Sequence, residues 1–99
     1  MDLARVVGTV VSSHKSPKLE GQKFLLLEKL DAGTMKPKND FVVSMDAVGA
    51  NAGEVVFYVT GSSARLTKAT EGRPSDATIV AIVDNVERDG KFIYNRNAS

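Results

Sequence analysis

Apolar and β-branched residues occur in short runs, and polar segments that contain glycine or proline separate them. The runs cover residues 3–12, 24–30, 41–45, 54–60 and 77–83. Runs of this length between turn signals predict β-strands, and the leucine-rich run 24–30 is assigned to a strand for the same reason. Asp89-Gly90 is a hairpin signal that predicts a turn between residues 86–87 and an edge strand at 91–94. The pattern therefore predicts five core strands and a C-terminal β-hairpin.

The first run predicts an irregular strand. Val6, Gly8 and Val10 share one face, and residues 7, 9 and 11 share the other. Both faces are largely apolar, which predicts burial on both sides. A glycine inside a strand indicates a bulge or a sharp bend, as at the corner of a barrel. The run 77–83 is almost continuously apolar, so a central position is expected for it.

Together these elements predict an all-β fold, a small five-stranded OB-like β-barrel that is closed or nearly closed. A short helical turn is expected to start at Ser62 or Ser63 and to run through Leu66, followed by an exposed loop over 67–75. The 99 residues form a single domain over 1–99, with 95–99 expected to be a flexible tail. A domain of this size has a thin stability margin, and oligomerisation is a common remedy.

Composition narrows the classes of function. The net charge is +1, 42% of residues are hydrophobic and there is no cysteine. The lack of cysteine excludes disulfides and Cys-ligated zinc. The small net charge does not favour binding to nucleic acid or to a membrane surface. No apolar run reaches the roughly 20 residues needed to cross a bilayer, and no signal-peptide pattern opens the chain. We expect an intracellular protein.

The candidates for catalysis are weak. His14 lies in a polar loop with no acidic residue beside it in the sequence, so we expect an exposed loop residue. Asp46, Asp76 and Asp84 each lie at a strand end, where aspartate commonly caps or turns the chain. We therefore expect no catalytic residue, no metal and no cofactor.

The alternative function is a monomeric oligonucleotide-binding module, because small barrels of this type bind single strands. Such binding requires exposed aromatic rings. Phe24, Phe41 and Phe57 lie inside apolar runs and are expected in the core. The aromatic residues that could face outward are Tyr58, Phe92 and Tyr94. Because acidic residues also interrupt the lysines of residues 15–38, nucleic-acid binding is the less favoured interpretation.

Two glycine-containing segments are the most informative part of the chain. One covers residues 46–54 and the other covers 61–65. The first lacks the ending of a phosphate-binding loop. The second could hold an anion at a helix start, although a capped turn with Arg65 paired to a carboxylate across an interface is favoured. The small residues of both permit close approach, and the candidate interface or axis residues are Gly49, Ala50, Asn51, Ala52, Gly53, Gly61, Ser62, Ser63 and Arg65.

Four segments, taken in order, resemble the pentameric vertex proteins of bacterial microcompartment shells. They are residues 4–21, 46–54, 61–65 and 73–84. This family includes the vertex proteins of carboxysomes and of ethanolamine, propanediol and glycyl-radical compartments. The resemblance implies a homopentamer that plugs the five-fold corners of a polyhedral shell in the bacterial cytoplasm, beside hexameric facet proteins. It implies no reaction, and a hexamer of this chain stays an open alternative.

Two positions depart from the family pattern. Asn51 stands where the family usually has glycine, and Ser75 replaces a residue that is commonly apolar. Asparagine tolerates left-handed φ better than other non-glycine residues, so we expect the backbone shape to persist with an added polar side chain. If the loop lines the five-fold axis, five Asn51 amides would surround it.

Overall fold

Seven β-strands make up most of the described chain. The computed structural model describes residues 2–11, 23–61 and 77–96. The strands are β1 (Asp2–Val10), β2 (Phe24–Leu30), β3 (Pro37–Asp46), β4 (Val55–Thr60), β5 (Ala77–Ile82), β6 (Asn85–Arg88) and β7 (Lys91–Asn95). Each predicted run corresponds to one strand, although β3 begins at Pro37 rather than at Phe41. The helical turn expected after Gly61, the loop 67–75 and His14 lie outside the described residues.

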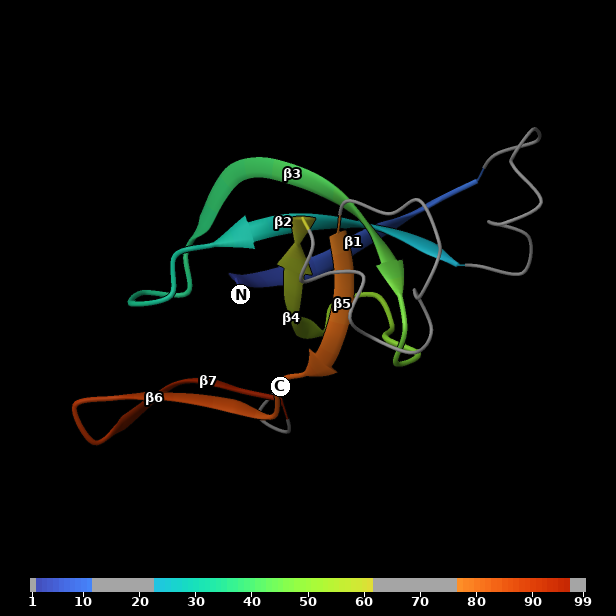
Figure 1. Cartoon of the computed structure of the whole chain (residues 1–99). Coiled ribbons are helices and arrows are strands. Elements are labelled where there is room, and N and C mark those ends of the chain that lie inside the picture. The colour runs from blue at the N-terminus through green and yellow to red at the C-terminus, as the bar shows by residue number, and fades with distance from the viewer. Residues whose placement is uncertain (1, 12–22, 62–76, 97–99) are drawn as a thin grey trace.

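The first five strands close into a barrel in the order β1-β2-β3-β5-β4, with β1 and β4 completing the circle. All pairs are antiparallel except β3 and β5, which are parallel and pair only at Met45–Thr78 and Asp46–Ile79. The first half of β3 arches away from β5 above the barrel (Figure 1). The predicted five-stranded all-β barrel is confirmed, and β5 has a neighbour on both sides.

A bulge in β1 confirms the expectation for Gly8. The register with β2 shifts between Val6, which pairs with Leu27, and Gly8, which pairs with Leu26. A Cβ on Gly8 would meet Leu26 Cβ at 3.7 Å, an ordinary van der Waals distance. The bulge therefore bends the strand without a steric need for glycine.

The barrel interior is filled by buried side chains from β1, β2, β4 and β5 and from the loop after β3, and the partly buried Val42 of β3 packs against them. The buried members are Ala4, Val6, Leu25, Leu27, Ala50, Val56, Tyr58, Ala77 and Ile79. Each large apolar side chain buried here contributes about 1.5–3 kcal/mol to folding. Tyr58 is only 2% exposed, so its expected outward orientation is wrong. Because β4 is apolar on both faces, its sequence pattern could not tell which face the barrel encloses.

The β6–β7 hairpin follows β5 and projects below the barrel in the view of Figure 1. A second core cluster of Leu3, Leu30, Val55 and Val83 packs with Val86 and Tyr94 of the hairpin. The Arg88 guanidinium donates a hydrogen bond of 2.9 Å to the Gly33 carbonyl in the turn between β2 and β3. Asp89 (φ 53°) and Gly90 (φ 82°) both have positive φ, as a type I′ turn requires. The predicted hairpin is thus confirmed, and this cluster joins it to the barrel wall.

Candidate functional site

The loop between β3 and β4 is organised by the carboxylate of Asp46. Its Oδ1 accepts hydrogen bonds from the backbone N–H groups of Val48 (3.1 Å) and Gly49 (2.9 Å), and its Oδ2 accepts one from Ala50 (3.0 Å). The expected turn-forming role of Asp46 is confirmed. Ala50 is fully buried in the barrel interior. Its side chain is therefore a core contact of its own subunit.

Backbone conformation explains the glycines at this site. Gly49 (φ 77°), Gly53 (φ 86°) and Gly61 (φ 64°) all occupy the left-handed region, which a side chain strains. Apart from the adjacent residues in the chain, no atom of the described residues lies within 4 Å of a Cβ placed on any of them. Within one chain, glycine is therefore needed for φ and not for close packing, and the exposed positions leave room for a neighbouring surface.

Asn51 does not have the positive φ that its alignment with a family glycine led us to expect. It is absent from the non-glycine residues with left-handed φ, which are Met35, Asn39 and Asp89. Its backbone N–H instead donates to Glu54 Oε1 at 2.7 Å, and its carbonyl accepts from the Glu54 N–H at 3.1 Å. Asparagine at this position consequently adds an exposed amide without backbone strain.

Glu54 joins this loop to the C-terminal hairpin. Its side chain is only 12% exposed, and its Oε2 lies 2.7 Å from Arg96 Nη2. Arg96 Nη1 also lies 3.3 Å from Asp84 Oδ1, and the Arg96 N–H donates to the Asp84 carbonyl at 2.8 Å. One carboxylate thus holds the loop through one oxygen and the end of β7 through the other. Asp84 has the structural role expected for it.

Arg5 makes a second connection between β1, the loop and the hairpin. Its Nη1 donates to the Gly53 carbonyl at 2.7 Å, and its guanidinium carbon lies 5.6 Å from the centre of the Tyr94 ring. The Gly53 N–H donates to the Val6 carbonyl at 2.8 Å, and the Val6 N–H donates to the Glu54 carbonyl at 2.9 Å. The C-terminal half of the loop is therefore fixed against β1.

The structure describes part of the predicted set. Gly49, Asn51, Ala52 and Gly53 form the exposed rim of the β3–β4 loop, and Gly61 directly follows β4. Ser62, Ser63 and Arg65 lie outside the described residues, as do Asp76 and Ser75. Sequence reasoning missed Arg5, Glu54 and Arg96, because their partners lie far away in the chain. The sequence did offer one signal for these contacts, which is Glu54, the acidic residue at the end of the glycine-containing segment 46–54.

An exposed apolar stripe crosses the outside of β1, β2 and β3. It consists of the exposed Val7, Phe41 and Val43 and of the partly buried Leu26. Leu26 pairs with Val43 on one side and with Gly8, beside Val7, on the other. Phe41 and Val43 are each 49% exposed and Val7 is 43% exposed. The expectations of a core Phe41 and of burial on both faces of β1 are therefore wrong for the single chain, because no element among the described residues covers this face of the barrel.

Reactive clusters are not evident among the described residues. No group of three or more His, Cys, Asp or Glu side chains in that part of the chain could hold a metal ion. Within the same ranges, no helix has the length and apolar character needed to cross a membrane. What the described residues present is a hydrogen-bonded loop, an apolar stripe and a hairpin, which are features suited to contact with another protein surface.

Comparison with known proteins gives consistent matches. Residues 1–84 match the family model described as ethanolamine utilisation protein EutN/carboxysome. The carboxysome shell vertex protein CcmL of Gloeobacter violaceus is 42% identical over 96 residues, which cover 97% of this chain and 95% of that protein. The microcompartment shell vertex protein EutN of Salmonella typhimurium is 36% identical, with 97% and 96% covered.

Solved structures agree with these matches. The structure of Gloeobacter violaceus CcmL superposes with a TM-score of 0.92 at 42% identity, covering 97% of this chain and 98% of that chain. GrpN from Rhodospirillum rubrum, described as a pentameric microcompartment shell protein, superposes with a TM-score of 0.80 at 41% identity, with 89% and 99% covered. The likeness extends over the barrel and the hairpin.

Proposed function

The chain belongs to the EutN/carboxysome family of microcompartment shell vertex proteins, and we propose that it forms pentamers that close the vertices of a polyhedral bacterial microcompartment. The observation that carries this proposal is the similarity of this chain to proteins named for that role. The similarity extends over nearly the whole length of this chain and of those proteins. A pentameric relative of 41% identity supports the assembly number. These findings favour a vertex protein over the oligonucleotide-binding module.

We further propose that its neighbours in the shell are hexameric facet proteins and that its own role is structural. Closed cyclic symmetry needs a heterologous interface, in which one patch meets a different patch of the next subunit. The exposed rim of the β3–β4 loop is the first candidate patch, together with Gly61, Ser62, Ser63 and Arg65. The apolar stripe is the second, because exposed apolar patches of this kind mark protein contacts.

The mass in solution tests the assembly. Light scattering after size exclusion should give about five times the 10.6 kDa of one chain. A mass six times that of the chain would support the hexamer, and a single-chain mass would support the monomeric module. Titration with a labelled single-stranded oligonucleotide at several salt concentrations should show no salt-dependent binding.

Substitutions test the interface patches separately. Ala52→Trp adds bulk to the exposed rim at ordinary φ, and Val43→Lys adds a charge to the stripe. Both should lower the mass below that of the pentamer while far-UV circular dichroism stays unchanged. Ala32→Trp and Ala32→Lys, in the exposed turn between β2 and β3, are the matched controls and should leave the mass unchanged. A normal pentamer from Ala52→Trp would remove the rim from the interface, and one from Val43→Lys would remove the stripe.

A further inference from the structure

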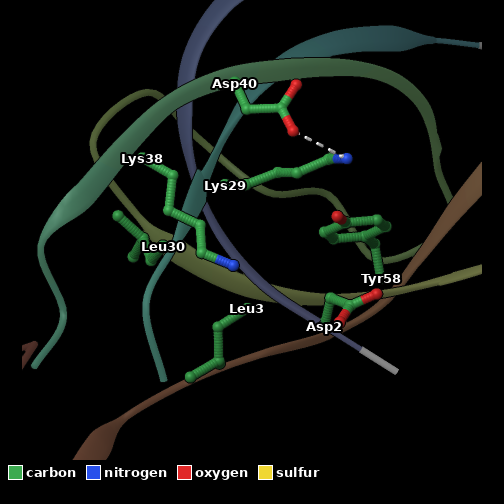
Figure 2. Close-up of a pocket in the computed structure, with 7 residues that line it drawn as sticks. All are labelled: Asp2, Leu3, Lys29, Leu30, Lys38, Asp40 and Tyr58. Atoms are coloured by element: carbon green, nitrogen blue, oxygen red, sulfur yellow. Dashed lines mark ion pairs between the residues drawn. The ribbon is translucent and has the colours of Figure 1, made fainter. Parts of the chain in front are cut away.

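A polar pocket lies at the mouth of the barrel, beneath the arch of β3. Its volume is about 170 Å³, and its lining residues come from β1, β2, β3 and β4 (Figure 2). They are Asp2, Leu3, Lys29, Leu30, Lys38, Asp40 and Tyr58. The pocket exists because β3 pairs with β5 only at its C-terminal end, so the first half of β3 leaves the barrel open on this side. Barrel mouths are common places for small-molecule sites.

Tyr58 extends from the barrel core into this pocket. Its hydroxyl points toward the space between Lys29, Lys38 and Leu30 (Figure 2). The residue is only 2% exposed. Burial chiefly, and then the Asp2 carboxylate, raise the pKa of Tyr58 above its usual value. The hydroxyl therefore stays protonated at neutral pH and can donate a hydrogen bond into the pocket.

The charges that line the pocket are balanced, but only one pair is joined. Lys29 Nζ lies 3.2 Å from Asp40 Oδ2. Among the described residues, neither Lys38 nor Asp2 takes part in an ion pair. Lys38 directs its ammonium group into the pocket from β3, and Asp2 lies beside the Tyr58 ring (Figure 2). One cation, one anion and one hydroxyl donor are thus left to interact with a ligand.

We propose that this pocket binds a small zwitterion of the amino-acid class. The ligand carboxylate would accept from Lys38 and the Tyr58 hydroxyl, and its ammonium group would face Asp2. A ligand with only a carboxylate would be repelled by the Asp2 carboxylate, and a ligand with only an ammonium group would be repelled by the Lys38 ammonium group. Leu3 and Leu30 supply an apolar wall. The volume is below the ~300–1,000 Å³ of drug-sized sites, which fits a ligand of a few heavy atoms.

Titration of the assembled protein with three zwitterions and two singly charged molecules tests the proposal. Glycine, β-alanine and 4-aminobutyrate carry both charges at increasing separation, and acetate and ethylamine carry one charge each. We expect saturable shifts of backbone amide signals around Tyr58 and Lys38 for at least one zwitterion, with a Kd on the order of 1 mM for so small a ligand. Acetate and ethylamine should bind at least tenfold more weakly. The proposal would be overturned if acetate bound as tightly as the zwitterions, or if none of the zwitterions gave saturable shifts.

Variants then locate the bound ligand. Tyr58→Phe, Lys38→Gln and Asp2→Asn should each raise the Kd about tenfold, because each removes one hydrogen bond or charge that the ligand uses. Lys36→Gln, an exposed lysine outside the pocket lining, is the matched control and should leave the Kd unchanged. Lys38 and Asp2 are exposed, so their variants keep the test valid even if Tyr58→Phe is unstable. Wild-type binding by both exposed variants would show that the ligand lies elsewhere.

Discussion

Removal of the Glu54 carboxylate should destabilise the protein more than any exposed acidic substitution. Glu54→Ala removes the acceptor of the Asn51 N–H at 2.7 Å and the partner of Arg96 at 2.7 Å. The carboxylate is 12% exposed and Arg96 is 43% exposed, so this ion pair is only partly screened by water. The substitution leaves the loop without its C-terminal closure and the end of β7 without its connection to the barrel.

The expected cost follows from these two contacts. A hydrogen bond to a charged group contributes about 1.5–3 kcal/mol, and a partly exposed ion pair adds ~0.5–1 kcal/mol. Some of this is recovered when water reaches the freed groups, so the net loss should be about 2–3 kcal/mol. In a domain of this size, that loss lowers the melting temperature by on the order of 10–20 °C. Glu54→Gln keeps a neutral acceptor for Asn51 and should lose about half as much.

Thermal unfolding followed by circular dichroism measures the loss of stability. All variants are compared at one protein concentration, because assembly stabilises the folded chain. Glu87→Ala, at an exposed position on β6, is the control and should change stability by less than about 0.5 kcal/mol. The double variant Glu54→Ala/Arg96→Ala should reveal a coupling of about 1 kcal/mol. A Glu54→Ala melting temperature within about 2 °C of wild type, or zero coupling, would refute the assigned role.

Three further predictions concern pH and glycine. Hydrogen bonds from two turn amides lower the pKa of Asp31 below 3.8, so its stabilising effect is present above that pH and lost as pH falls. Asp31→Asn should thus flatten the acid limb of melting temperature against pH. The pKa of Tyr58 is raised above 10.0, so stability should fall as pH rises beyond 10, and Tyr58→Phe should abolish this alkaline loss. Gly53→Ala, at φ 86°, should cost about 1 kcal/mol in urea unfolding, whereas Gly8→Ala should cost less than about 0.5 kcal/mol.

The strands could be predicted because their signals are local. The β-branched runs, the Asp89-Gly90 turn and the glycine inside β1 each act through neighbouring residues, and the structure confirms all of them. The orientation of Tyr58 and Phe41 could not be predicted in the same way. In β4 and β3, both faces carry apolar side chains, so alternation does not identify the face that the barrel encloses.

The candidate site was predictable only as a backbone shape. Gly49 and Gly53 of the β3–β4 loop take positive φ, a conformation that glycine adopts readily. The long-range contacts of this loop come from Arg5 and Arg96, which lie near the two ends of the described chain. Such pairings arise from the closure of the barrel and the return of the hairpin, for which the sequence contains no local signal. The φ of Asn51 could not be inferred from its alignment with glycine, because that alignment does not show the hydrogen bonds that its backbone makes with Glu54.

Barrel closure also bears on aggregation. Each of the five barrel strands has hydrogen-bonded neighbours on both sides, whereas the β6–β7 sheet has only two strands. Among the described strands, free edges that could recruit another chain therefore lie along the first half of β3, which β5 does not pair, and along the hairpin. The hairpin is short and carries Glu87, Arg88 and Lys91, and charged side chains on short edge strands oppose such pairing. A protein concentrated beside many copies of itself in a shell is thereby kept from forming unintended intermolecular sheets through the hairpin.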